Sequence, residues 1–383
     1  MRVSNHQRRL CFVIFLGASS ITVLGQQVVD GPYVSYHGDQ VIVTTIIKEE
    51  DLLKPVVKKH SFEQQANIVL DVVPEGEPKF AFQVKLQSSI ANAPAVYPAS
   101  GKLFLISDIE GEFKPFRELL LAAKVMNKDY QWTFGNGSLV IAGDLFDRGK
   151  DVIPELWLLY KLEDEAKAQG GKVHVILGNH DIMNLSGDHR YTDAKYFKSA
   201  WLLKTDCTGL FGADMELGRW LRSKNLMEKI GDLLILHGGV SSPINDLRMP
   251  LQQLNDRSRP FYSVANKRAQ ITDETLLPVF AGNTAPFWYR GFFMQPRAST
   301  SQVDSTLQLY ACNRIIVGHT ILAKNIGLYY NGKVLALDVN QHQGDNRAVL
   351  MEGNEWSIIN AKGKKRKLVY DPSNDNLTDD DIK

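Results

Sequence analysis

The feature that most constrains the fold of this chain is a set of five short apolar runs, each of which ends in a polar cluster. In chain order they are KLFLI before SDIEG, LVIA before GDLFDRG, VHVIL before GNHD, LLIL before HGG and RIIV before GHT. Short apolar runs bounded by turns are typical of strands that are covered on both faces. Because open α/β sheets place ligands at the carboxyl ends of their strands, the pattern predicts a ligand site at one sheet edge.

Helical patterns between these runs complete the prediction of an α/β protein. EFKPFRELLLAAKVM has Pro115 in its first turn, and DVIPELWLLYKLEDEAKAQGG ends in two glycines that stop a helix. Two insertions, at about 184–230 and 241–300, lie beside the polar clusters. We expect them to form a rim that shapes the substrate opening.

The chain divides by composition into four segments. Residues 1–25 join a basic start to a short apolar run and predict a secretory signal, so we expect a protein that is exported to the periplasm or secreted, without a membrane span after signal removal. Residues 26–98 predict a small accessory β region, and residues 99–360 the main domain. Residues 361–383 predict a basic edge followed by a disordered tail.

Charge and cysteine content restrict the partners only weakly. The formal net charge is +1, and KGKKRK at 362–367 has no interleaved aromatic residue, so we expect no nucleic-acid partner. After signal removal Cys207 and Cys312 remain, and they fit a disulfide as well as two buried thiols. The sequence gives no indication of oligomeric state.

The polar clusters contain the residue types that bind divalent cations and phosphate. The candidate metal ligands are Asp108, Glu110, Asp144, Asn179, His237 and His319, and their polar neighbours are Asp147, Arg148, His180 and Arg290. Carboxylates and imidazoles in this mixture suit two divalent cations that share one carboxylate. Two such cations can clamp a phosphate and hold a bridging hydroxide for in-line attack, and a nearby histidine can protonate the leaving oxygen.

Residues 102–340 contain several motifs in the same order as a known family, which they resemble. GDLFDRG, GNHD, HGG and GHT resemble the calcineurin-like metallophosphoesterases, and the DRG spacing is similar to their phosphoprotein-phosphatase branch. LGNHDIMNLSGDHRYT, GRWLRSKN and PFWYRGF resemble the bacterial Shewanella-like phosphatases. The resemblance implies a β-sandwich core flanked by helices.

The same resemblance implies a role for each candidate residue. Asp108 and residue 110 would bind the first metal, Asp144 would bridge both metals, and Asn179, His237 and His319 would bind the second. His180 would be the general acid, oriented by Asp147, while Arg148 and Arg290 would hold phosphate oxygens.

Two positions depart from the family pattern. Asp181 stands where the family often has Glu, and Glu110 stands where it has His. In an extended segment residues 108 and 110 point to the same side, so we expect Glu110 to be directed as the histidine would be. Its carboxylate favours Mn²⁺ or Mg²⁺ over Zn²⁺, and we interpret the site as rebuilt rather than lost because every other position has a competent residue.

The sequence therefore predicts a metal-dependent phosphomonoester hydrolase. Its substrate would be a phosphorylated serine, threonine or tyrosine of a protein, or a small phosphate ester. Its cofactors would be two divalent cations, with Mn²⁺ expected first and Mg²⁺, Fe or Zn²⁺ as alternatives. A phosphodiesterase or nucleotidase uses the same metal clamp and remains an alternative, as does a catalytically weakened phosphate-binding protein.

Overall fold

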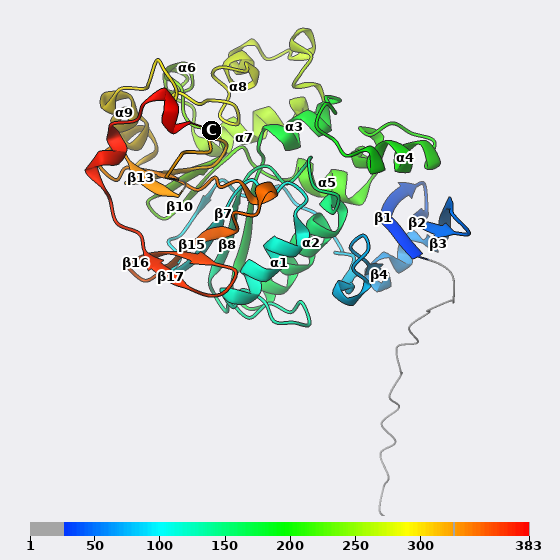
Figure 1. Cartoon of the computed structure of the whole chain (residues 1–383). Helices are drawn as coiled ribbons and strands as arrows, with labels where there is room; N and C mark the ends of the chain where they lie inside the picture. Colours follow the sequence, from blue (N-terminus) through cyan, green and yellow to red (C-terminus); the bar gives the residue numbers. More distant parts are fainter. Residues whose placement is uncertain (1–26, 325, 383) are drawn as a thin grey trace, which may run out of the picture.

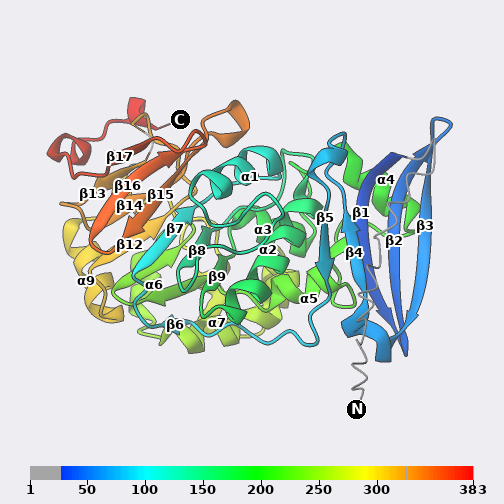
Figure 2. The same ribbon diagram turned by 90° about the horizontal axis from the view of Figure 1, so that it is seen from below.

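Two six-stranded sheets face each other at the centre of the molecule (Figure 1, Figure 2). The computed structural model describes residues 27–324 and 326–382, so the predicted signal at 1–25 lies outside the described residues. The strands of one sheet, in spatial order, are β17 (Lys365–Lys367), β16 (Glu355–Asn360), β15 (Arg347–Glu352), β7 (Lys102–Ile106), β8 (Ser138–Ala142) and β9 (Lys172–Ile176). Those of the other are β13 (Gly327–Tyr329), β14 (Val334–Ala336), β12 (Arg314–Val317), β11 (Leu233–Leu236), β10 (Met227–Ile230) and β6 (Val96–Tyr97).

All five apolar runs form strands of the two sheets, which confirms the predicted fold class. In the first sheet β7, β8 and β9 are parallel neighbours, and in the second β11 and β12 are parallel neighbours. Side chains from both sheets, among them Leu105, Val140, Ile235 and Ile316, are fully buried in one apolar cluster. The parallel pairing places the carboxyl ends of these strands at a common edge in each sheet.

Helices cover the outer faces of the sandwich. They are α1 (Phe113–Ala122), α2 (Val152–Ala168), α3 (Asn179–Ser186), α4 (Ala194–Leu202), α5 (Glu216–Arg222), α6 (Ser242–Asp246), α7 (Leu251–Ser258), α8 (Leu277–Phe280) and α9 (Thr300–Tyr310). The two predicted helical patterns around Pro115 and before Gly170 correspond to α1 and α2. Helix α2 lies between the first sheet and the N-terminal strands (Figure 2), and its Trp157 indole N–H donates to the carbonyl of Pro32 over 2.9 Å.

The N-terminal segment forms a three-stranded antiparallel sheet and a separate strand pair. The sheet contains β1 (Gln27–His37), β2 (Gln40–Glu49) and β3 (Leu52–Ser61), and the pair contains β4 (Val69–Val72) and β5 (Phe82–Lys85). Strand β3 has no apolar alternation and contains Pro55 opposite Ile46, so its sequence did not suggest a strand. Proline is tolerated there because β3 is an edge strand.

The short strands β6 and β10 correct two predicted boundaries. β6 lies inside the predicted accessory region at 26–98, yet it pairs in parallel with β10, which lies inside the first predicted rim insertion. Both segments therefore contribute strands to the sandwich, which leaves α4 and α5 as the helical part of that insertion.

The prediction of a disordered tail after residue 370 is wrong for the residues that the structure describes. A 3₁₀ turn at Pro372–Asp375 lies against the turn between β13 and β14. The Asp375 carboxylate accepts hydrogen bonds from the backbone N–H groups of Tyr330 and Asn331, and the Asn374 amide donates to the carbonyl of Leu328. These side chains satisfy backbone groups at a sheet edge, which composition alone does not reveal.

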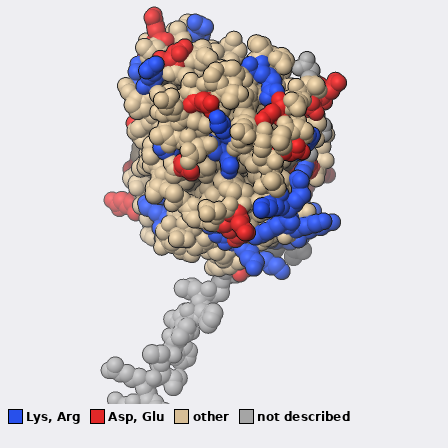
Figure 3. All heavy atoms as spheres, turned by 90° about the vertical axis from the view of Figure 1, so that its left-hand side faces the viewer, with Lys and Arg blue, Asp and Glu red and all other residues tan. Residues whose placement is uncertain are grey.

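The predicted basic edge is part of the first sheet. Lys365, Arg366 and Lys367 form the exposed edge strand β17, whose charges discourage pairing with another chain. Figure 3 shows the face that carries the C-terminal strands, where basic side chains gather in one area and acidic side chains are scattered over the rest.

Two further sequence questions concern the cysteines and membrane spans. Cys207 and Cys312 are both buried and free, so the described chain has two thiols rather than a disulfide between them. Within 27–324 and 326–382 no helix combines the length and apolar character that a bilayer span requires.

Candidate active site

Nine of the ten candidate residues lie in the loops and helix that follow the carboxyl ends of the parallel strands. Asp108 and Glu110 follow β7, Asp144, Asp147 and Arg148 follow β8, and Asn179 and His180 begin α3 directly after β9. His237 follows β11, His319 follows β12, and Arg290 comes from the second rim insertion. Hydrogen bonds join these loops: the backbone N–H of His319 donates to Asp108 Oδ2 over 3.1 Å, and that of His180 donates to Asp144 Oδ1 over 2.9 Å.

The expectation of an extended segment at Asp108–Glu110 is wrong, although Glu110 still reaches the site. Both residues have a φ of 52° and lie in the left-handed region. Four other candidates share this conformation, namely Asp144, Asp147, Arg148 and His319. Left-handed backbone at residues other than glycine is uncommon and collects at functional sites, because the surrounding structure must hold it.

One group of ligand atoms comprises Asp144, His237 and His319, which lie within 4.8 Å of one another. His237 Nδ1 is 2.7 Å from the carbonyl of Ala142, and His319 Nε2 is 3.1 Å from that of Trp288. Each of these ring nitrogens must be the N–H donor, so the other nitrogen has a lone pair directed into the site. Such orientation by a backbone carbonyl is typical of metal-binding histidines.

Asn179 joins this group through its side-chain amide. The end of this amide lies 3.0 Å from His237 Nε2, which is also 3.0 Å from Asp144 Oδ2. Burial alone lowers the pKa of His237, but the charges of Asp144 and Asp108 raise that pKa to about 9. The surrounding carboxylates therefore favour positive charge at this position.

A second group of ligand atoms comprises Glu110, Asp144 and His180, so Asp144 belongs to both. Burial and the charge of Asp108 raise the pKa of Glu110 to about 8, although its ion pair with Arg148 lowers it. Burial also raises the pKa of Asp108, with the charge of Asp144 adding to the effect. Several carboxylates are thus held close together away from water. Their ionised forms would raise the free energy of the folded state unless bound cations neutralised the charge.

The residues present therefore fit two divalent cations. Asp144 is shared by both groups of ligand atoms, as expected of a bridging carboxylate. Asn179, His237 and His319 with Asp144 would hold one cation, and Asp108 and Glu110 with Asp144 would hold the other. The set with Asn179, His237 and His319 mixes nitrogen and oxygen donors, whereas the set with Asp108 and Glu110 consists of carboxylates.

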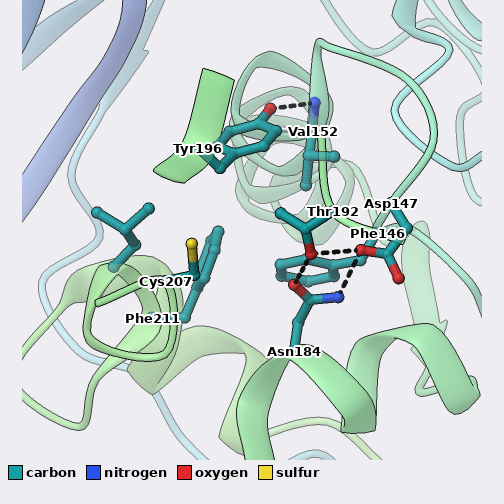
Figure 4. A pocket seen from close by; sticks show the side chains of 9 residues that line it. Phe146, Asp147, Val152, Asn184, Thr192, Tyr196, Cys207 and Phe211 are labelled. Carbon is teal, nitrogen blue, oxygen red and sulfur yellow. Dashed lines mark hydrogen bonds between the residues drawn. The ribbon is translucent and has the colours of Figure 1, made fainter. Parts of the chain in front are cut away.

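His180 is held by a hydrogen-bond network through Asp147. His180 Nδ1 lies 2.6 Å from Asp147 Oδ2. Asp147 Oδ1 accepts hydrogen bonds from Asn184 Nδ2 over 2.8 Å and from Thr192 Oγ1 over 2.9 Å (Figure 4). Burial lowers the pKa of His180, but Asp144 and the bond to Asp147 raise that pKa to about 9. The ring is therefore a proton donor at neutral pH. A small, mostly apolar cavity that includes Phe146 and Cys207 lies beside this network (Figure 4).

The two arginines flank the cation ligands from different elements. The Arg148 guanidinium forms an ion pair with Glu110, and its side chain is 41% exposed. Arg290 donates to the carbonyl of His319 and to Thr320 Oγ1. Both cationic groups thus lie next to ligand-bearing loops, where they can receive an anionic substrate.

The change at Asp181 leaves the architecture intact because this residue orders two loops. Its carboxylate accepts hydrogen bonds from the backbone N–H groups of Gly178, Asp144 and Leu145, over 2.7, 3.1 and 2.9 Å. The side chain therefore acts on the backbone rather than on a ligand position, and the shorter Asp reaches all three groups.

Sequence reasoning missed three residues of this region, of which Asn184 and Asp338 are buried and Thr192 is partly buried. Asn184 and Thr192 hold Asp147, but single polar residues in a helix and a loop give no pattern that marks them. Asp338 follows β14 at the same sheet edge as His319, and it is buried. It could have been found, because VLALD repeats the pattern of an apolar run that ends in a polar residue.

Comparison with known proteins gives matches along most of the chain. Residues 101–322 match the model of the calcineurin-like phosphoesterase family. Shewanella-like protein phosphatase 2 of Arabidopsis thaliana is 26% identical over 63% of this chain and 72% of its own length. Shewanella-like protein phosphatase 1 of Plasmodium berghei is 25% identical over 66% of this chain and 71% of its own length.

A solved structure matches the fold as well as the sequence. The cold-active protein-tyrosine phosphatase of a psychrophilic Shewanella species superposes with a TM-score of 0.78 and is 31% identical. The match covers 89% of this chain and 99% of that protein, and therefore includes N-terminal residues outside the family model.

Proposed function

This chain belongs to the calcineurin-like phosphoesterase family, and we propose that within it the protein is a two-cation phosphomonoesterase that acts on phosphorylated proteins. The chain is a hydrolase of phosphate esters with candidate ligands for divalent cations. The observation that supports the proposal best is the convergence of the shared Asp144, the His180–Asp147 pair and two arginines at one sheet edge.

Two divalent cations, when bound, would supply positive charge to the phosphoryl oxygens and activate the attacking water. Asp144 would be shared between them, with Asn179, His237 and His319 on one side and Asp108 and Glu110 on the other. We propose Mn²⁺ as the native cation because carboxylate ligands favour hard cations over Zn²⁺.

The proton for the leaving oxygen would come from His180. Asp147 fixes the ring through Nδ1 and thereby leaves the Nε2 proton for the leaving group. The pKa of about 9 keeps this ring protonated at neutral pH. Arg148 and Arg290 would hold the remaining phosphoryl oxygens, and two arginines suit the doubly charged end of a monoester better than a diester.

An aromatic surface beside the site supports a protein as substrate. We define it as Tyr191, Phe197 and Trp201, which are 48%, 49% and 77% exposed. The Tyr191 ring centroid lies 5.2 Å from that of His180, and Phe197 and Trp201 are one helical turn apart on α4. Phe197 and Trp201 would contact residues that flank a phosphorylated side chain, whereas a small phosphate ester at His180 would reach Tyr191 alone.

We further propose that the protein acts outside the cytoplasm, in the periplasm or after secretion. The basic and apolar start of residues 1–25 supports this proposal. Fractionation of cells that express the full-length protein tests it, and retention of the uncleaved protein in the cytoplasm would contradict it.

The reaction class is tested by parallel rates on an aryl phosphate monoester and the corresponding bis-aryl diester, with Mn²⁺ present. We expect kcat/KM for the monoester to exceed that for the diester by at least about 10²-fold. Arg290→Ala should reduce this preference, because it removes one of the groups that hold the additional anionic oxygen. A higher rate on the diester would instead establish the diesterase alternative.

A further inference from the structure

Asp338 is a buried carboxylate near the candidate site, and the proposed reaction assigns it no role. It follows strand β14, which runs parallel to β12, so it lies at the same sheet end as His319. The residue is only 4% exposed, and its Oδ1 has no hydrogen-bond partner among the described residues. A buried carboxylate oxygen without a donor is costly, so it indicates an unaccounted partner.

The loop that carries Asp338 is fastened to the loop that carries Asp108 and Glu110. Gln341 Nε2 donates to the carbonyl of Ser107 over 3.0 Å, and His342 Nδ1 lies 2.7 Å from Glu112 Oε1. The Oε1 of Gln341 is itself buried and without a partner in the described chain. Two oxygen acceptors from the 338–342 loop are therefore held beside the carboxylate group of the site.

The charges of the same ligands act on Asp338. Burial raises the pKa of Asp338 well above its usual range, and the charges of Asp108, Glu110 and Asp144 raise it further. Arg290 lowers this pKa, but its guanidinium donates to His319 and Thr320 rather than to Asp338. The charges of three carboxylates thus act on a fourth, and within residues 27–324 and 326–382 no donor reaches Asp338 Oδ1.

From these contacts we infer that Asp338 contributes an oxygen donor to the cation that Asp108 and Glu110 hold, with Gln341 fixing the loop in place. The inference rests on the proposed function, because it requires that this centre binds cations. It makes the first cation site a cluster of carboxylates alone, whereas the second has two imidazoles. Oxygen donors favour Mg²⁺ and Mn²⁺, so the two sites should differ in metal preference.

The test is Mn²⁺ titration of the chelator-treated protein by calorimetry, wild type beside Asp338→Asn. This substitution keeps the shape of the side chain and removes its charge. We expect the wild type to bind two Mn²⁺ ions, and the variant to bind one of them about 10- to 100-fold more weakly while the other is unchanged. Zn²⁺ affinity should fall less than Mn²⁺ affinity, because Zn²⁺ depends more on the imidazole site.

Thermal unfolding provides a second readout that separates the inference from loss of structure. With chelator present, Asp338→Asn should melt no lower than the wild type, because it removes repulsion among buried carboxylates. The rise in melting temperature on adding Mn²⁺ should be smaller in the variant. Glu228→Gln is the matched control: Glu228 is equally buried but contacts His174 and Asn225, so its Mn²⁺ affinities should equal those of the wild type.

Other outcomes contradict the inference in distinguishable ways. Unchanged affinities for both Mn²⁺ ions would overturn it while leaving the proposed function in place. Unchanged Mn²⁺ binding with a raised KM would show that Asp338 acts through Arg290, and would also overturn it. If the wild type neither bound Mn²⁺ nor hydrolysed phosphate esters, the proposed function itself would fail. Should Asp338→Asn not fold, Asp338→Ser serves in its place with the same expected loss.

Discussion

At the scale of single residues, the account depends on His180 as a proton donor held by Asp147. His180→Gln should lower kcat on an alkyl phosphate by about 10²- to 10⁴-fold, because the poor leaving group needs its proton. The loss on p-nitrophenyl phosphate should be much smaller, since this leaving group departs as an anion. Initial rates on both substrates measure the difference.

The network around Asp147 offers a graded comparison for the same prediction. Thr192→Val removes one of the two donors to Asp147 Oδ1, so it should reproduce the selective loss on the alkyl substrate in weaker form. Thr320→Val, at a hydroxyl near Arg290, should not discriminate between leaving groups. Equal losses on both substrates in His180→Gln would contradict the role of His180 as general acid.

The scale of structural elements concerns how strand ends bring the ligands together. Gly143, after β8, has a φ of 92°, and a Cβ there would lie 2.4 Å from His237 Nδ1. Gly143→Ala should therefore displace His237 and lower kcat by at least about 10²-fold, which steady-state kinetics with Mn²⁺ would measure. Gly135→Ala is the control, because Gly135 also has a positive φ but nothing lies within 4 Å of its Cβ position.

The two glycine variants separate backbone strain from displacement of a ligand. Gly135→Ala should cost about 1–2 kcal/mol of stability from its left-handed backbone and leave kcat unchanged. If both variants were less stable but kept the full kcat, catalysis would not depend on the present position of His237.

Helix α4 carries the prediction about substrate class. Phe197→Ala and Trp201→Ala should each lower kcat/KM on a phosphopeptide by about 3- to 10-fold and leave kcat/KM on p-nitrophenyl phosphate unchanged. Val369→Ala is a suitable control, because Val369 is 65% exposed and follows β17, which lies at the opposite end of the molecule from α4 (Figure 2). Parallel losses on peptide and aryl phosphate would contradict a peptide-binding role for this surface.

The sequence predicted these elements unevenly, for physical reasons. Apolar runs such as KLFLI and RIIV indicate strands that are buried on both faces, and the sequence therefore predicted these strands correctly. Asp108 and His319 follow the ends of these two strands, so their place at the site was predictable as well. Strand β3 is exposed and charged, and residues 371–382 are ordered by side-chain bonds to a distant turn, so neither has a local apolar pattern. The left-handed backbone at Glu110 and the donors to Asp147 depend on contacts between loops, which periodicity does not encode.

At the scale of the whole molecule, buried carboxylates outside the ligand set make stability depend on pH. Glu155 in α2 is fully buried, and burial, together with the charge of Asp181, raises its pKa well above the usual range. The folded state therefore retains this proton to higher pH than the unfolded state. Its contribution to stability is complete below the ordinary pKa of Glu and declines as pH rises above that value.

Glu155→Gln should remove this pH dependence. In the presence of chelator, the melting temperature of the variant relative to the wild type should be higher at pH 8 than at pH 5. Glu355→Gln, at an exposed position, should show the same difference from the wild type at both pH values. A constant difference for Glu155→Gln would mean that Glu155 does not retain its proton in the folded state.

The central claim concerns the molecule as an enzyme: the strand ends of two sheets together build one two-cation phosphatase centre. The most direct test is hydrolysis of an aryl phosphate by the chelator-treated protein after addition of Mn²⁺, Mg²⁺ or Zn²⁺, beside Asp144→Asn. We predict turnover that requires added metal, is highest with Mn²⁺, and falls by at least about 10³-fold when the shared carboxylate is lost. Turnover that persists with chelator, or that Asp144→Asn leaves intact, would contradict the account.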